Sequence, residues 1–201
     1  MPDRFKSLFN PNLLRTHCVG LEPQLGSRER ALVERWSRLC ADPQTERSTQ
    51  AMFLIDIFGS LLGYTSFTER MGAYTMQIET ASPEVKGGKT PDACLGFYGP
   101  GRDITRAVVE LKSPGADLDA KQGGYGNITP VDQAFGYLGN FDDCRWAIVS
   151  NFLVIRLYSK RRGQGYAHEF QLADLVDEDV LHQFLFLLHR DRLLAEPPGN
   201  S

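Results

Sequence analysis

Three apolar segments in the middle of the chain constrain its fold most strongly. They are rich in branched and aromatic residues, as β-strands are, and they span 93–98 (ACLGFY), 106–112 (RAVVELK) and 146–158 (WAIVSNFLVIRLY). The third is long enough for a hairpin, with a turn near Ser150-Asn151. A further segment, 75–80 (TMQIET), alternates between apolar and polar residues as a strand does. The chain therefore predicts a central sheet.

Helical patterns surround these strands in the sequence. Apolar residues recur at helical spacing in 28–41 and in 44–62, and the second pattern ends at Gly63. A last apolar block, 172–194, also has helical spacing. Residues 1–27 carry turn formers without a clear period and are predicted to form an arm or loop. This order predicts an α/β fold with a mixed central sheet flanked by helices.

A long loop and a short helix separate two of the predicted strands. The loop, 113–129, is rich in glycine, and loops of this length in a compact domain are often functional. Thr129 is a good N-cap, Pro130 suits the first helical position, and Asp132 suits the third. We expect this helix to run to about Leu138.

Composition narrows the possible function only slightly. The chain has 201 residues, of which 42% are hydrophobic and 23% charged, which suits one domain, alone or with an appended helical segment. The formal net charge of −3 does not by itself indicate nucleic-acid binding. Any DNA contact must come from a local patch, for which Lys160-Arg161-Arg162 is a candidate, although such a triplet can also be a solvated turn.

The sequence predicts a cytoplasmic protein. Residues 1–20 lack the apolar run of a signal peptide, and the chain has no stretch of eighteen apolar residues. The four cysteines form no CxxC pair, which argues against a zinc knuckle and a disulfide framework and fits a reducing compartment.

Acidic and basic residues stand where two predicted strands begin and end. Asp92 precedes one strand, and Glu110-Leu111-Lys112 ends another, with seventeen residues between Asp92 and Glu110. Side chains alternate along a strand, so Glu110 and Lys112 share one face while Leu111 points into the core with its carbonyl available as a ligand. If the two strands are neighbours, Asp92 approaches Glu110. Each feature alone is also compatible with an ordinary surface strand or turn.

This combination predicts a Mg²⁺ site, because two carboxylates and a carbonyl are all oxygen donors. A cation there would polarise a phosphate and acidify a bound water. Lys112 would orient or deprotonate the attacking water and offset the charge on the transition state. Glu46, early in a predicted helix, is a further candidate ligand, and Glu79 is a weaker one for the same role.

Gln133 and Tyr137 lie four residues apart on the helix after the long loop, and therefore share one face of it. That face can look back at the acidic site, where both side chains can hydrogen-bond a phosphate or a water. The alternative is that Tyr137 packs in the core and that Gln133 is incidental.

Together these residues resemble the PD-(D/E)xK nuclease superfamily. The resemblance rests on Pro91-Asp92, on Glu110-Leu111-Lys112 and on the helix that contains Gln133 and Tyr137. More narrowly, LDAKQGGYGNITPVDQAFGYLGNF and WAIVSNFLVIRLY are similar to the loop, QxxxY helix and closing strands of the N-terminal endonuclease domain of single-chain restriction-modification enzymes, types IIG and ISP. The likeness covers about 44–160.

The resemblance implies a restriction-endonuclease-like fold and an Mg²⁺-dependent DNA endonuclease, with Mn²⁺ able to substitute. It implies that Asp92 and Glu110 bind the metal, with the Leu111 carbonyl, and that Lys112 is the catalytic lysine. Gln133 and Tyr137 belong to its motif helix, and Glu46 matches loosely the helical acid of many members. Ser150 and Asn151 stand where the family often has a polar pair.

The same resemblance implies a division of the chain and a set of partners. Residues 1–43 would be an arm and helix, 44–165 the nuclease core, and 166–201 a C-terminal helical segment. The substrate would be double-stranded DNA, and cutting both strands would need two copies or two visits. Methyltransferase and target-recognition domains, which such enzymes carry downstream, are missing from this chain. A catalytically silent nucleic-acid-binding module and a protein-interaction module with the same fold are the alternatives.

Overall fold

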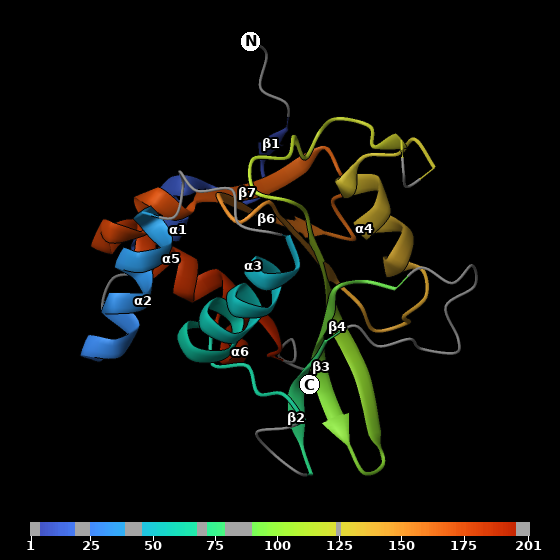
Figure 1. The fold of residues 1–201 in the computed structure, drawn as a ribbon, viewed down its shortest axis with the longest axis horizontal. Helices are drawn as coiled ribbons and strands as arrows, with labels where there is room; N and C mark the ends of the chain where they lie inside the picture. Colours follow the sequence, from blue (N-terminus) through green and yellow to red (C-terminus); the bar gives the residue numbers. More distant parts are fainter. Residues whose placement is uncertain are drawn as a thin grey trace.

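The computed structural model describes residues 5–18, 25–38, 46–67, 72–78, 90–123 and 126–195, without the side chains of 46–48. A seven-stranded mixed sheet forms its centre, with strands in the order β1-β7-β6-β5-β4-β3-β2 (Figure 1). The strands are β1 (Lys6–Ser7), β2 (Tyr74–Ile78), β3 (Ala93–Gly99), β4 (Arg102–Leu111), β5 (Trp146–Ser150), β6 (Val154–Ser159) and β7 (Tyr166–Gln171). Strands β4 and β5 run parallel, as do β1 and β7, and the other neighbours are antiparallel.

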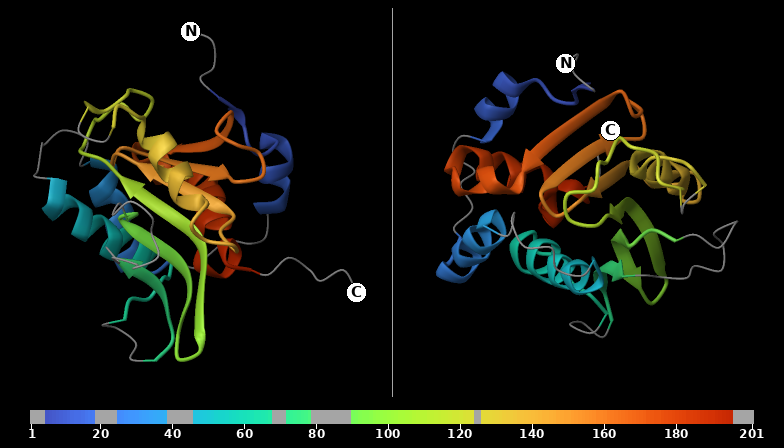
Figure 2. Two further views of the ribbon diagram at one scale, coloured as in Figure 1. Left: turned by 90° about the vertical axis from the view of Figure 1, so that its right-hand side faces the viewer. Right: turned by 45° about the horizontal axis from the view of Figure 1, so that its top comes forward.

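Helices cover the two faces of the sheet unequally (Figure 1, Figure 2). The α-helices are α1 (Pro11–Cys18), α2 (Ser27–Arg38), α3 (Glu46–Phe53), α4 (Pro130–Leu138), α5 (Glu178–Leu188) and α6 (Arg190–Leu193). A π-helix, η2 (Leu54–Leu61), continues α3, and a 3-10 helix, η4 (Leu172–Val176), follows β7. All helices except α4 contribute to the larger core, which includes Val109 and Leu111 of β4. Helix α4 packs on the opposite face, against Val108.

The predicted elements between 28 and 158 are confirmed in type and order. The helix expected over 44–62 is present as α3 and η2, and its apolar face is buried at Phe53, Leu54, Ile57, Phe58 and Leu61. The predicted hairpin turns between β5 and β6 at the expected position. Helix α4 begins with Thr129 as its N-cap in a capping box with Asp132. The bonds from the Thr129 backbone and side chain lower the pKa of Asp132.

The prediction of an irregular N-terminal arm was wrong, and one strand near the C-terminal end of the chain was not predicted. The N-terminal arm contains β1 and α1, and β1 extends the sheet by pairing with β7. The C-terminal segment is helical from Leu172 to Leu193, as the apolar block 172–194 predicted, but it begins with the unpredicted strand β7, whose residues 167–171 pair with β6. Within the described residues, no helix is long and apolar enough to cross a membrane.

Candidate active site

Asp92 lies immediately before β3 and is held by two hydrogen bonds. Its Oδ2 accepts from the Leu111 amide at 2.6 Å, and its Oδ1 accepts from Gln50 Nε2 at 2.9 Å. Ala93 pairs with Val109 in the antiparallel β3–β4 ladder, so one further step along that register places Asp92 opposite Glu110. The predicted approach of these two strands is therefore observed, and it brings the aspartate to the end of β4.

Glu110 and Lys112 share the face of the sheet that α4 covers, as the alternation along the strand predicted. Lys112 Nζ lies 2.6 Å from Glu110 Oε1, and the two side chains are only 5% and 3% exposed. Leu111, between them, packs into the core on the other face. Burial of an opposite-charge pair costs desolvation energy that an apolar pair would avoid, so its presence is not explained by stability alone.

Helix α4 extends this pair into a polar chain. Lys112 Nζ donates to Gln133 Oε1 at 3.1 Å, and Gln133 Nε2 donates to the Tyr137 hydroxyl at 2.8 Å. Gln133 and Tyr137 are both buried, at 7% and 5% exposure. Gln133 thus connects the lysine to the tyrosine. Tyr137 also packs in the smaller core, as the alternative interpretation expected, and its predicted contact with a phosphate or a water stays a prediction.

The side chains of the two remaining sequence candidates fall outside the described residues. Glu46 begins α3, one turn before Gln50, but its side chain lies outside the described part of the chain. Glu79 also lies outside the described residues. The structure thus brings together Asp92, Glu110, Lys112, Gln133 and Tyr137, with the Leu111 main chain beside them.

The role of the polar pair Ser150-Asn151 is structural. Ser150 ends β5, and its carbonyl accepts from the Lys112 amide at 2.8 Å, which fixes the main chain at the candidate lysine. The Asn151 side chain accepts from the Leu153 and Val154 amides, which shapes the β5–β6 turn. Its Nδ2 donates to the Ala116 carbonyl at 2.8 Å and so fastens the long loop.

A buried arginine holds the same loop from β6. Arg156 contacts Asp119 of the loop at 2.8 Å and Glu169 of β7 at 2.7 Å. Burial lowers the pKa of Arg156, but the bonds to Asp119 and Glu169 outweigh this effect and raise it. Sequence reasoning missed this residue and Gln50. The position of Gln50, four residues after Glu46 on one helix, was the available signal for the latter.

The donor set at the end of β4 fits Mg²⁺. Asp92 and Glu110 offer carboxylates and Leu111 a carbonyl, and a carboxylate oxygen can accept more than one interaction. Among the described residues, no three side chains of His, Cys, Asp or Glu gather closely enough to hold a metal. Mg²⁺, which retains several waters, suits such a small set of protein oxygens.

The basic triplet after β6 is only partly available for contacts. Lys160 Nζ donates to the Leu138 carbonyl at 3.0 Å and more weakly to the Phe141 carbonyl, so it stabilises the end of α4. Arg161 is exposed, and Arg162 lies over the Tyr166 ring at 5.7 Å. Two of the three residues therefore remain candidates for a phosphate contact.

No protein-family model, curated protein or solved structure matches this chain.

Proposed function

We propose that this chain is a Mg²⁺-dependent endonuclease domain with a restriction-endonuclease-like fold, of the PD-(D/E)xK kind. One observation carries the proposal: the polar chain that joins Glu110 to Lys112, Gln133 and Tyr137, with Asp92 bonded to the main chain of the same strand end. These side chains come from segments far apart in the sequence. Their convergence on one face of the sheet supports a catalytic centre over incidental surface polarity.

The proposed reaction is hydrolysis of a DNA phosphodiester. Water attacks phosphorus in line, a new P–O bond forms, and the bond to the leaving oxygen breaks. That oxygen departs with a proton, which leaves a phosphate monoester and an alcohol. Mg²⁺ or Mn²⁺, held by Asp92, Glu110 and the Leu111 carbonyl, would supply the charge that polarises the phosphate and acidifies the water.

Lys112 is suited to stabilise charge in this reaction. It sits against the Glu110 carboxylate and donates to Gln133, as an ammonium group does. A cation fixed at this point would offset the negative charge that grows on the phosphate oxygens. Tyr137 would keep Gln133, and through it the lysine, in position.

The proposed substrate is double-stranded DNA, held mainly through its phosphates, so that binding falls steeply with salt. The chain would be the cleavage module of a restriction-modification enzyme and would act with methyltransferase and target-recognition domains. The described part of the chain forms one such centre, so cutting both strands would require a second copy or a second visit.

A catalytically silent module with the same fold is the second candidate. The observation that favours it is the near-complete burial of the Lys112–Glu110 pair, in which each charge is already neutralised by the other. Such a module would bind nucleic acid or another protein without cleavage.

Cleavage of supercoiled plasmid in Mg²⁺ or Mn²⁺ tests the proposal. Wild type is compared with Lys112→Met and Asp92→Asn, and Lys6→Met, an exposed lysine on the edge strand β1, is the matched control. We expect metal-dependent nicking that both site variants lose and the control keeps. Absence of nicking, together with absence of Mn²⁺ binding by calorimetry, would refute the catalytic centre. Salt-sensitive DNA binding would then separate a nucleic-acid-binding module from a protein-interaction module.

A further inference from the structure

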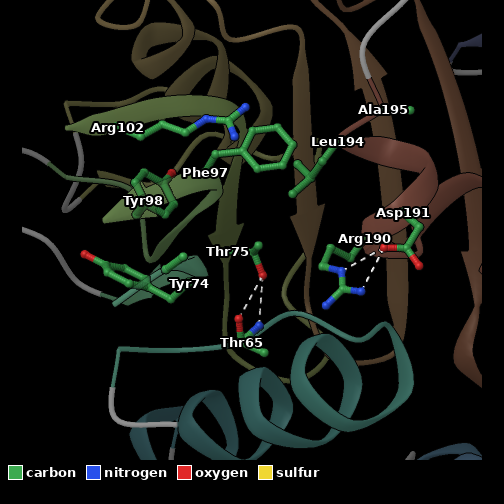
Figure 3. A pocket seen from close by; sticks show the side chains of 11 residues that line it. Thr65, Tyr74, Thr75, Phe97, Tyr98, Arg102, Arg190, Asp191, Leu194 and Ala195 are labelled. Carbon is green, nitrogen blue, oxygen red and sulfur yellow. Dashed lines mark hydrogen bonds and ion pairs between the residues drawn. The ribbon is translucent and has the colours of Figure 1, made fainter. Parts of the chain in front are cut away.

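A pocket of about 470 Å³ opens at the other end of the sheet from the candidate active site. Its walls come from the segment that follows η2, from β2, β3 and β4, and from α6 (Figure 3). The side chains that carry the following argument are Thr65, Tyr74, Thr75, Phe97, Arg102 and Arg190. The volume lies in the range of small-ligand sites.

Flat aromatic and cationic groups line this pocket. The Arg102 guanidinium lies over the Phe97 ring, 4.1 Å from its centroid, and forms a planar, positively charged layer. Tyr74 contributes a second ring, tilted by 30° to the ring of Tyr98. Such surfaces favour a planar ligand, because rings and guanidinium groups stack on one another.

Two arginines make the pocket cationic. Arg102 is exposed and makes no ion pair with any residue that the structure describes. Arg190, on a different wall in Figure 3, lies 2.8 Å from Asp191, which neutralises part of its charge. The hydroxyls of Thr65 and Thr75 also line the pocket and lie 3.4 Å from each other. An anionic group near Arg102 would therefore gain a charge-assisted bond that no described residue provides.

A second hollow of about 330 Å³ adjoins the first. The two share Tyr74, Tyr98 and Arg102 as lining residues. Arg102 thus lies where a ligand that occupied both hollows would cross from one to the other. This is where the phosphate between two nucleotides would lie if each hollow held one base.

We propose that this pocket binds a nucleotide, with its base stacked on the Arg102–Phe97 layer or on Tyr74 and its phosphate on Arg102. The nucleotide can be a single molecule or one unit of an unpaired nucleic-acid strand, since the recognising chemistry is the same.

This site is separate from the proposed catalytic centre. Arg102 and Glu110 lie near opposite ends of β4, about 26 Å apart along the strand at ~3.3 Å per residue. They also face opposite sides of the sheet, since Phe97 packs against the larger core and Val108 belongs to the smaller one. The proposal therefore does not depend on nuclease activity.

The test measures binding of 5′-mononucleotides and of short single-stranded oligothymidine by calorimetry, with the full chain. The variants are Arg102→Gln and Arg190→Gln, and Arg161→Gln is the matched control, an exposed arginine on the β6–β7 hairpin. Thermal unfolding checks that each variant is folded. The titrations contain EDTA and no divalent metal ion, which keeps this test independent of the proposed cleavage.

We expect saturable binding that weakens about tenfold in Arg102→Gln, the loss typical of one charge-assisted hydrogen bond, and that is unchanged in the control. A smaller loss is expected in Arg190→Gln, because Asp191 already offsets its charge. Equal affinity for mononucleotides and oligonucleotides would identify a single nucleotide as the ligand. Binding of oligonucleotides alone would identify a strand that spans both hollows. Absence of saturable binding, or an equal loss in Arg161→Gln, would overturn the proposal.

Discussion

Replacement of Lys112 by methionine should destabilise the fold as well as abolish cleavage. At 2.6 Å, the attraction between Lys112 and Glu110 is about 6 kcal/mol with an effective dielectric constant of about 20. Desolvation offsets part of this attraction, and removal of one partner from such a buried pair costs about 3–5 kcal/mol. Methionine preserves much of the length of the lysine side chain, so the lost stability reflects removal of the charge rather than formation of a cavity.

The double variant Glu110→Gln with Lys112→Met separates stability from catalysis. With both charges removed, no buried carboxylate is left uncompensated, and we expect most of the lost stability to return, with a coupling energy on the order of 3 kcal/mol. Urea unfolding followed by circular dichroism measures stability, and plasmid nicking is expressed per folded molecule. The double variant should be stable and inactive.

Two results would refute this reasoning. A decrease in unfolding free energy below about 1 kcal/mol in Lys112→Met, as is usual for exposed ion pairs, would mean that the Lys112–Glu110 pair is not buried as described. Nicking by the stable double variant would mean that neither charge is needed for cleavage.

Three further predictions concern stability. Thr129→Ala removes the two side-chain bonds between Thr129 and Asp132, keeps the bond from the Thr129 amide to that carboxylate, and should cost about 1 kcal/mol in urea unfolding. The hydroxyl bond adds to the amide bond in lowering the pKa of Asp132, so its share of the stabilisation is present at neutral pH and is lost in acid, and the cost of the substitution should shrink as pH falls through the carboxyl range. Gly96→Ala would push a Cβ against a carbonyl oxygen of β4 and should lower the melting temperature markedly, whereas Gly136→Ala, in open space on α4, should raise or preserve it. Burial lowers the pKa of His168, so the unfolded chain binds the proton more tightly and stability should decrease as pH falls below about 6.5. In pH-resolved melts, His168→Gln should reduce this dependence, and the remainder should come from His189, whose pKa burial also lowers.

Local chemistry explains why much of the fold could be predicted. The start of α4 depends on Thr129 and its next three residues, and the shared face of Glu110 and Lys112 depends only on strand alternation. The hydrogen bond between Gln133 and Tyr137 follows from their four-residue spacing on one helix. The contact of Gln133 with Lys112 follows once that helix is known to face the site. Because these features depend on few or no long-range contacts, they can be predicted from local patterns in the sequence.

The features that were missed depend on distant pairing or on weak signals. Strand β1 has two residues and is a strand only because β7 lies beside it. Strand β7 has no regular alternation between buried and exposed positions, so its sequence does not stand out. Helix α1 did have a local signal: the Asn10 side chain accepts from the Asn12 and Leu13 amides, ahead of Pro11 at the first helical position.

One irregularity in β4 determines which face each end of the strand presents. Leu95 pairs with Ala107, but Gly96 pairs with Thr105, so the register shifts by one residue at Arg106 and forms a β-bulge. In a regular strand, Arg102 and Glu110 would share a face, because they are an even number of residues apart. The bulge reverses this relation and turns Arg102 toward Phe97, while Glu110 stays under α4. Strand alternation alone would have placed both proposed sites on one face, and only the pairing with β3 shows that they lie on two.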